Sequence, residues 1–328
     1  LDLVKNYATA QELQNAKLFS QENVEKLLGY EIDFKNDTLS IKFPWNKFSK
    51  KLIRCDKRPT KKQVLKVTMS IFDPLGLFEY VTSKAKLVYH QCIANKMDWY
   101  EIIDDRINAH WKKLLAWIAQ AEKIKIPRVY IEDEKIIGKT QLVTFTDASK
   151  EMSCCCSYIR LIDVMNQQIS VRLIGAKSKI NAHTKARTIP EMELEALDIG
   201  VKFIKRLIES HEIKFDEIII LIDNTCVLEW VKTVPKKQTV YMANRLKRIK
   251  NCEMPLIIKW IPTDLMAADY GTKMSSMPLS CYENEWFVPI IFNKEEKVWL
   301  NYVPKCSETT YSHVEIEECT YETVIDIK

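Results

Sequence analysis

No stretch of this sequence is apolar for long, although 47% of its 328 residues are hydrophobic. A membrane-spanning helix needs roughly 20 consecutive apolar residues, and no run approaches that length. The first ten residues, LDLVKNYATA, also lack the apolar core of a secretory signal and an initiator Met. We therefore expect a soluble fragment or processed piece of a longer protein, with no membrane partner.

Cysteine occurs ten times, but no CxxC pair is present. The three consecutive cysteines at 154–156 lie in a strand-like stretch, where neighbouring side chains point to opposite faces, so we expect reduced thiols that act as small apolar residues. Cys306, His313 and Cys319 could be imagined as zinc ligands, but their spacing matches no standard site. The sequence predicts neither a disulfide scaffold nor a structural zinc.

Charge of one sign is only slightly in excess, since the net charge is +5 with 28% charged residues. This balance permits a phosphate-rich partner without requiring one. The length is sufficient for two ordinary domains, and the composition favours a globular chain over a disordered one.

The C-terminal half shows the clearer pattern of elements. Its apolar runs predict a βββ-α-β-α-α-β-α order, in which the first three strands form an antiparallel meander. The expected strands are 141–149, 152–162, 169–179, 216–223 and 256–262, and the expected helices are 189–213, 224–233, 239–252 and a short last turn at 267–273. The continuous apolar run 216–223 is typical of a central strand that is covered on both faces.

Four acidic residues stand at the ends of these elements: Asp147, Glu193, Asp223 and Asp269. Taken singly, each Asp could cap a helix or close a turn, and Glu193 could be a solvated side chain in the first turn of its helix. However, Glu193 follows Met192 on the flank of the apolar stripe, so it can face the sheet. The carboxyl ends of neighbouring strands in a mixed sheet meet in one crevice, where the four acids could gather.

Four carboxylate ligands without His or Cys favour hard cations, Mg²⁺ or Mn²⁺, over zinc. Two such ions about 4 Å apart can activate a water and stabilise the leaving oxygen in phosphodiester hydrolysis. Asp147 is the natural bridge between two ions, Glu193 and Asp223 would complete one ion's shell, and Asp269 would help hold the other. The repulsion between clustered carboxylates would make a role without metal improbable.

The N-terminal portion predicts a different unit. Residues 27–43 form a hairpin pattern around Asn36 and Asp37, and Thr60 with Gln63 is a capping-box signature for a helix that runs through Ile71. The sequence Asp73-Pro74-Leu75-Gly76 ends that helix, and further helices are expected over 83–95 and 105–121. The polar segment 131–140 is the expected boundary.

Basic and aromatic side chains are candidates for contacts with nucleic acid. The candidates for phosphate contacts are Lys61, Lys62, Lys66, Lys177 and Lys179, and a denser basic run on one helix comprises Arg245, Lys247, Arg248 and Lys250. Ordinary solvated surface explains any single one of them as well or better. The tryptophans at 99, 111, 117, 230 and 260 lie in apolar patterns, which favours core anchors over stacking platforms.

The order and context of the four acids resemble the Asp-Glu-Asp-Asp set of the ribonuclease H fold. The wording TDASKEMSCCCSYIR, RTIPEMELEAL, LIDNTCVLEWV and WIPTDLMAADYGTK resembles the Pao/BEL class of LTR retrotransposon polyproteins. Upstream, LGYEIDFKNDTLSIKF and SIFDPLGLFEYVTSKAKLVYHQC resemble the segment between reverse transcriptase and ribonuclease H in those elements, often catalogued as the Pao retrotransposon peptidase family. The resemblance covers roughly residues 25–290.

The resemblance implies an α/β fold: a ribonuclease H-like mixed five-stranded sheet flanked by helices, preceded by a mostly helical region like a reverse-transcriptase thumb or connection. The implied division is 1–130 for that region, 131–140 for a linker, 141–290 for the ribonuclease H-like domain, and 291–328 for a tail toward a domain such as integrase. The implied partners are an RNA/DNA hybrid or template-primer and the polymerase and integrase portions of the polyprotein. The implied location is a cytoplasmic virus-like particle or the nucleus.

The implied activity is Mg²⁺-dependent cleavage of the RNA strand of an RNA/DNA hybrid. Two alternatives remain: a catalytically decayed nucleic-acid-binding module that supports reverse transcription, and an aspartic peptidase. The residues Met266-Ala267-Ala268 stand where the family usually has Asn-Pro-Ala, no His follows in this loop, and Glu191 replaces a usual basic residue, all of which favour a weakened enzyme. A polymerase Tyr-x-Asp-Asp loop and an Asp-Thr/Ser-Gly peptidase turn are both absent, and Asp104-Asp105 fits helix initiation better.

Overall fold

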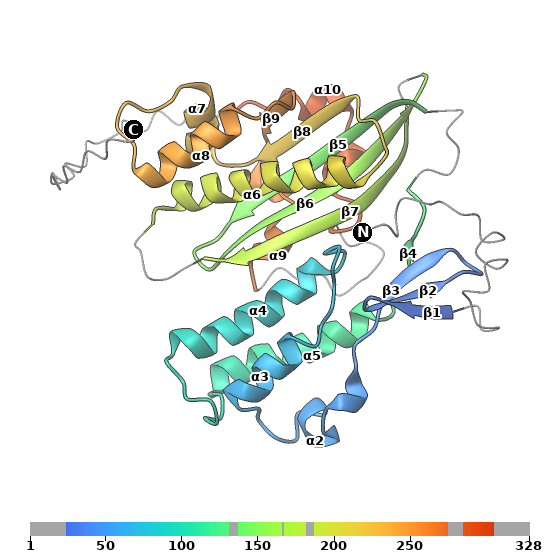
Figure 1. The fold of residues 1–328 in the computed structure, drawn as a ribbon, viewed down its shortest axis with the longest axis vertical. Helices are drawn as coiled ribbons and strands as arrows, with labels where there is room; N and C mark the ends of the chain where they lie inside the picture. The colour runs from blue at the N-terminus through green and yellow to red at the C-terminus, as the bar shows by residue number, and fades with distance from the viewer. Residues whose placement is uncertain (1–23, 131–136, 166, 182–186, 275–284, 305–328) are drawn as a thin grey trace, which may run out of the picture.

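The computed structural model describes residues 24–130, 137–165, 167–181, 187–274 and 285–304. Its centre is a five-stranded mixed sheet in the order β7-β6-β5-β8-β9 (Figure 1). The strands are β5 (Ile137–Ala148), β6 (Met152–Asp163), β7 (Gln168–Ile180), β8 (Glu217–Ile222) and β9 (Leu256–Trp260). The first three pair antiparallel, while β8 is parallel to both β5 and β9. The predicted mixed sheet is confirmed.

Strand β5 is covered on both faces, and its apolar side chains alternate between two cores. Helix α6 (Ile189–Ser210) packs on one face, where Leu142 joins the core beneath it. On the other face, Val143 and Phe145 join a core that includes residues from the N-terminal region. The strand begins at Ile137, four residues before the predicted start, because the pairing with β6 extends to Asp163.

Helix α6 begins in a capping box between Thr188 and Glu191, with Pro190 in the first turn. The Thr188 N–H donates to the Glu191 carboxylate at 3.0 Å, so Glu191 stabilises the start of the helix that carries Glu193. Glu191 is therefore a structural residue of this helix start.

At Gly200 the helix lies so close to β5 that an added Cβ would come within 2.5 Å of Thr146 Cγ2.

Helices α7 (Thr225–Lys232), α8 (Val240–Lys250) and the short α9 (Asp269–Thr272) complete the predicted order. Two 3₁₀ turns, η4 (Thr263–Leu265) and η5 (Ile290–Asn293), and α10 (Glu296–Trp299) follow β9. Helix α8 packs beside α6, whereas α9 lies against β6 and β5.

The N-terminal region contains a second, four-stranded antiparallel sheet in the order β1-β2-β3-β4 and several helices (Figure 1). Its strands are β1 (Val24–Leu27), β2 (Tyr30–Asp33), β3 (Thr38–Ile41) and β4 (Ile126–Pro127), and its helices are η2 (Trp45–Lys47), α2 (Lys50–Ile53), α3 (Lys61–Thr68), α4 (Glu79–Ala94) and α5 (Asp105–Ala121). The predicted capping box of Thr60 and Gln63 is present, and Asp104 caps α5 as expected. Helix α3 ends three residues before Ile71, and α4 begins four residues before Ser83.

The loop of Asp73, Leu75 and Gly76 connects the N-terminal region to β7. The Ala176 N–H of β7 donates to the Leu75 carbonyl at 3.0 Å. Gly76 has φ +73°, and a Cβ there would lie 1.9 Å from the Ala176 carbonyl oxygen, so only glycine fits. The Asp73 carboxylate accepts the Phe78 N–H at 2.9 Å and the Tyr30 hydroxyl, and burial raises the pKa of Asp73 to about 7.

One hydrophobic core joins the N-terminal helices to the five-stranded sheet. It contains Phe78 and Val81 from the N-terminal region together with Phe145 and Tyr158 from the sheet. The Trp286 indole N–H donates to the Leu77 carbonyl at 2.9 Å, which adds a polar connection to this core. The division at 131–140 stays a prediction, because residues 131–136 lie outside the described part of the chain.

Residues 290–300, at the start of the predicted tail, pack on the five-stranded sheet. Phe292 and Trp299 are buried in the core, where their rings lie 6.0 Å apart, and the Arg160 guanidinium lies 5.6 Å from the Trp299 ring. Burial of these two aromatic rings stabilises the packing of residues 290–300 on the sheet. Residues 305–328, with the cysteines and histidine considered as zinc ligands, lie outside the described residues. No helix among the described residues is both long and apolar enough to span a bilayer.

Candidate metal centre

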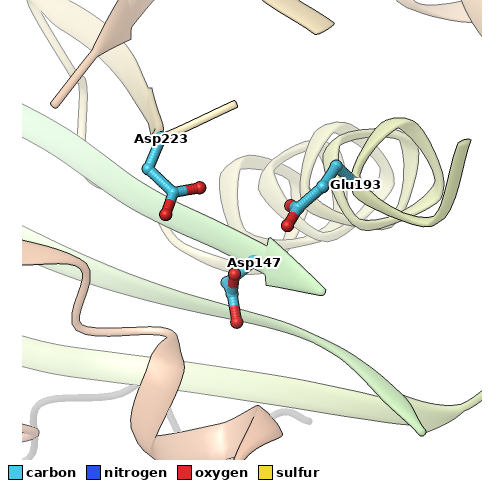
Figure 2. A group of neighbouring side chains, drawn as sticks. All are labelled: Asp147, Glu193 and Asp223. Atoms are coloured by element: carbon cyan, nitrogen blue, oxygen red, sulfur yellow. The ribbon is translucent and has the colours of Figure 1, made fainter. Parts of the chain in front are cut away.

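Three of the four predicted acids converge at one end of the five-stranded sheet (Figure 2). Asp147, Glu193 and Asp223 each offer a carboxylate oxygen, and these three oxygens lie within 4.8 Å of one another. The acids come from the end of β5, the first turns of α6 and the residue after β8, which are far apart in the sequence. The carboxyl ends of two neighbouring parallel strands meet here, as the sequence analysis expected.

Asp147 lies at the centre of the group and is only 3% exposed. It pairs with Cys154 of β6 but stands beyond Phe145, the last residue of β5 that pairs with β8, so it lies where these two parallel strands diverge. The Thr272 hydroxyl of α9 donates a hydrogen bond to Asp147 Oδ2. In the sequence, the only signal for Thr272 is its position three residues after Asp269.

Glu193 turns toward the sheet. Its Oε2 accepts the backbone N–H of Ala148 at 3.1 Å, and the residue is 8% exposed. The alternative of a solvated Glu on the outer face of α6 is therefore wrong. The neighbouring acids of the helix, Glu195 and Asp198, are also buried, but they pair with basic side chains instead.

Asp223 follows β8 directly and precedes α7. Its carbonyl accepts the Trp260 indole N–H at 2.7 Å, and the next residue, Asn224, caps α7 by accepting the Val227 N–H at 3.2 Å. These two contacts fix the backbone that directly follows the Asp223 side chain. Trp260 is accordingly a partly buried anchor of this site as well as of the core.

Asp269 lies beside the group of three acids rather than inside it. It is close enough to Asp147 to raise the pKa of that carboxyl, and its own Oδ2 pairs with the Lys273 ammonium one turn later. Lys273 is a site residue beyond those predicted from the sequence. A lysine four residues after an acid on a predicted helical turn was the signal for this ion pair.

Burial and mutual repulsion make the three central carboxyls poor anions in the absence of a cation. Burial, with the nearby charge of Asp269, raises the pKa of Asp147 to about 7. Burial and the charges of Asp147 and Asp223 raise the pKa of Glu193 to about 10. Burial also raises the pKa of Asp223. A cation placed among them would reverse these shifts, because an opposite charge favours the ionised form.

The donor set fits a hard divalent cation. All three side chains supply carboxylate oxygens, which Mg²⁺ and Mn²⁺ prefer, and no His or Cys side chain belongs to the group. Asp147 neighbours the other three acids, and its bridging of two ions stays a prediction. The charge of Lys273 at the Asp269 side partly offsets the repulsion.

Three of the basic residues predicted to contact phosphate form ion pairs within the protein. Lys179 and Arg245 pair with the buried Glu195, and Arg248 pairs with the buried Asp198 through two nitrogens at 2.8 Å each. Buried carboxylates need such partners, so these basic residues stabilise the packing of α6 against β7 and α8. Sequence spacing could not reveal these pairs, because the partners lie on different elements.

The other candidates are more accessible. Lys177 is exposed on β7, and Lys66 is exposed on α3 with its ammonium 5.5 Å from the Phe48 ring centroid. The Lys61 ammonium donates to the Met97 carbonyl at 2.6 Å, and the Lys62 ammonium lies 5.1 Å from the Tyr100 ring. Contacts of these lysines with nucleic acid stay a prediction.

The tryptophan prediction is right for four positions and wrong for one. Trp111 and Trp117 are buried, and Trp230 and Trp260 pack against the core. Trp99 is 51% exposed, because the turn after α4 places it on the surface, and the Lys61 ammonium lies 5.4 Å from its ring. The neighbouring Tyr100 is 75% exposed.

A mixed five-stranded sheet with a carboxylate group at the ends of β5 and β8 defines a ribonuclease H-like domain. The model of the Pao retrotransposon-like RNaseH-like domain family matches residues 60–224, and the chain belongs to this family. The match includes Asp147, Glu193 and Asp223 as well as helices α3 to α5. The resemblance noted in the sequence is thus confirmed, and the domain is of retroelement pol type.

Solved structures with low identity show similar arrangements. A foamy viral protease-reverse transcriptase dRH in complex with double-stranded DNA is 14% identical, with a TM-score of 0.42 over 74% of this chain and 38% of that chain. The N-terminal ribonuclease H domain of a Mycobacterium tuberculosis protein, as a fusion with maltose-binding protein, is 13% identical, with a TM-score of 0.29 over 41% of this chain and 91% of that one. Ribonuclease H1 of Halobacterium salinarum is 12% identical, with a TM-score of 0.25 over 40% and 91%. No curated protein matches the sequence.

Proposed function

We propose that this chain is a divalent-metal-dependent endonuclease that hydrolyses the RNA strand of an RNA/DNA hybrid. The single observation that carries the proposal is the convergence of Asp147, Glu193 and Asp223, whose carboxylate oxygens lie within 4.8 Å. Membership of the ribonuclease H-like family supports the choice of substrate. The foamy viral structure, which includes bound DNA, is consistent with a nucleic-acid partner.

The chain's own residues have distinct tasks in this proposal. Asp147 contributes to both cation positions, Glu193 and Asp223 hold one position, and Asp269 helps with the other. Two Mg²⁺ or Mn²⁺ ions held there would activate a water molecule and stabilise the leaving oxygen of the RNA strand. The Ala148 N–H fixes Glu193 Oε2, so the helix carboxylate is oriented before any ligand binds.

The nucleic acid would be recognised by its phosphates and groove shape rather than by base sequence. Lys62, Lys66 and Lys177 are exposed and form no ion pair with an acidic side chain among the described residues, so they are suited to phosphate contacts. Trp99 and Tyr100 add exposed aromatic rings on which an unpaired base can stack. Apart from Lys177 of β7, these residues lie on α3 and in the turn after α4, upstream of the carboxylate group in the sequence.

A direct test compares wild-type protein with Asp147→Asn on a labelled RNA/DNA hybrid in the presence of Mg²⁺ or Mn²⁺. We expect wild-type cleavage of the RNA strand and a loss of at least about 100-fold in the variant, because electrostatic stabilisation by such a group contributes on that order. The exposed Lys205, which lies on the same helix as Glu193 but far along it, provides a control as Lys205→Gln. Unchanged cleavage by Asp147→Asn would refute the proposal.

One observation favours a second function, that of a decayed module which binds nucleic acid without cutting it. Asp269 is paired with Lys273, whose ammonium occupies one of the carboxylate oxygens that a cation would need. Under this alternative, wild-type protein binds hybrid but does not cleave it at any Mg²⁺ or Mn²⁺ concentration. Cleavage by the wild-type chain would exclude it. The peptidase alternative gains no support from the part of the chain that the structure describes.

A further inference from the structure

Lys84 of helix α4 is a fully buried lysine, with 0% of its surface exposed. A lysine is almost never buried completely unless its ammonium has partners, because the desolvation of the charge is costly. Here burial lowers the pKa of Lys84 to about 7. The partners of this ammonium are therefore expected to be important for the structure around it.

Lys84 bonds to the short helix α9, which begins at Asp269, and to the residue that caps it. Its ammonium donates to the Tyr270 carbonyl at 2.6 Å and to the Lys273 carbonyl, although Lys84 precedes Tyr270 by 186 residues. These carbonyls belong to the end of α9, where a helix has no further N–H groups of its own to satisfy them. Lys84 thus supplies the hydrogen bonds that complete the short helix carrying Asp269.

The opposite side of α9 contacts the site itself. The Thr272 hydroxyl donates to Asp147, and the Ser149 hydroxyl donates to the Thr272 carbonyl at 3.2 Å. Gly271 packs so tightly on β6 that an added Cβ would lie 2.1 Å from Cys154 Sγ. A helix of four residues is held between α4 and the sheet, so its position depends on both.

We propose that Lys84 is a positioning residue of the metal centre: its hydrogen bonds to the Tyr270 and Lys273 carbonyls hold α9, and with it Asp269, against Asp147. The proposal rests on the function proposed above. It makes a residue of the upstream helical region part of the site's architecture, and it gives Asp269 a defined place beside the other three acids. The hydrogen bonds of Lys84 go to backbone carbonyls, so it acts on the site through α9.

The test measures the affinity of the intact chain for Mn²⁺ alone by isothermal titration. We expect Lys84→Met to weaken Mn²⁺ binding about 10- to 100-fold, as loss of a residue that orients a metal ligand typically does. Lys86→Met, on the same helix, is the matched control, because Lys86 bonds to Glu79 and Ser178 rather than to α9. Its Mn²⁺ affinity should equal that of the wild type.

A double-mutant cycle separates positioning from general loss of stability. If Lys84 acts through Asp269, then Lys84→Met should cause no further loss of Mn²⁺ affinity in an Asp269→Asn background. Should Lys84→Met not fold, Lys84→Gln retains an N–H donor for one carbonyl, and its Mn²⁺ affinity should lie between those of the wild type and Asp269→Asn. If Lys84→Met binds Mn²⁺ as tightly as the wild type, the inference about Lys84 is wrong while the proposed function stands; Lys84→Gln takes its place if only that variant folds. Full additivity of the Lys84 and Asp269→Asn effects has the same meaning. A wild-type chain that binds no Mn²⁺ overturns the proposed function together with it.

Discussion

The Glu193 carboxylate accepts the Ala148 N–H at 3.1 Å, which links the first turns of α6 to the end of β5 one residue after Asp147. The contact thereby holds a helix side chain over the end of a distant strand, since Glu193 follows Asp147 by 46 residues in the sequence. This contact settles which of the three glutamates at 191, 193 and 195 faces the other acids.

Glu193→Gln should raise the stability of the metal-free protein but remove the stabilisation that a bound metal ion provides. The pKa of Glu193 is raised from 4.5 to about 10, so folding must take up a proton at any pH between these values, and the free energy of unfolding falls as pH rises. Gln keeps the acceptor for Ala148 and removes this penalty. We expect the metal-free variant to be more stable than wild type by roughly 1–3 kcal/mol at pH 8, with a smaller difference at pH 5.

Addition of Mn²⁺ should raise the melting temperature of the wild type but not of Glu193→Gln. Calorimetry at pH 5 and pH 8, with and without Mn²⁺, measures both effects. Equal stability of the two metal-free proteins at pH 8 would contradict the assigned burial of Glu193. Equal stabilisation by Mn²⁺ would remove Glu193 from the metal centre.

Gly271→Ala should displace α9. The added Cβ would lie 2.1 Å from Cys154 Sγ and 2.9 Å from Cys154 Cβ, so the helix must move away from β6. We expect a loss of about 1–3 kcal/mol in the free energy of unfolding, as for other overpacked positions, and weaker Mn²⁺ binding. Chemical denaturation and titration with Mn²⁺ measure the two effects.

Cys154→Ala in the same chain provides the matched control for Gly271→Ala. It removes the sulfur that the new methyl group would meet, so part of the lost stability should return in the double variant. If Gly271→Ala has wild-type stability in the first place, α9 does not pack as tightly as the structure places it.

Asp198→Asn should lower the free energy of unfolding at neutral pH and make that free energy less dependent on pH in the acidic range. Burial opposes the ionisation of Asp198, but hydrogen bonds from Arg248 and Lys202 outweigh it and hold the pKa below 3.8. The contribution is therefore present above about pH 4 and is lost as pH falls through the folded-state pKa. We expect Asp198→Asn to cost about 1–3 kcal/mol at pH 7 and less at pH 3.

Urea denaturation at both pH values measures this effect. The exposed Lys205–Glu209 pair on the same helix gives the control Glu209→Gln, which should change stability little at either pH. A cost for Asp198→Asn that is the same at pH 7 and pH 3 would contradict the ion pair with Arg248.

Trp99→Ala and Tyr100→Ala should each weaken the binding of single-stranded DNA or RNA without lowering the free energy of unfolding. Stacking of a base on an aromatic ring contributes about 1–3 kcal/mol. Lys62→Gln should weaken binding and reduce the slope of log affinity against log salt by about one. Fluorescence anisotropy with a labelled oligonucleotide at several salt concentrations measures both.

Phe72→Ala is the control for these variants, because Phe72 is an exposed aromatic residue, at 52%, without a lysine over its ring in the described contacts. Its affinity for the oligonucleotide should stay at the wild-type value. If all three aromatic variants bind alike, Trp99 and Tyr100 are not a stacking surface.

The sequence predicted the elements of the sheet well because their signals are local. The run 216–223 reads as a covered strand, and the Thr60–Gln63 box begins a helix where it was expected. The three central acids could also be predicted from the sequence. Each lies near the end or the beginning of a strand or helix, and the order of the strands indicates which of these elements are neighbours. The pattern of residues along the chain was sufficient to predict these features.

Other features depend on contacts between distant segments, which no local pattern contains. Arg248 and Lys179 resemble solvated basic residues in the sequence, yet buried acids of α6 hold them. Trp99 has an apolar context but lies on a surface turn. Lys84 belongs to a run of mixed residues, and its burial depends on α9, far downstream.

The hydrogen bond from Ala176 to Leu75 also bears on solubility. Strand β7 lies at the end of the sheet order, so its free backbone groups could pair with a strand of another molecule. The loop around Gly76 occupies one of these groups and covers that position with a segment that cannot extend the ladder. A variant with a bulky residue at Gly76 would therefore open an aggregation-prone strand as well as loosen a loop.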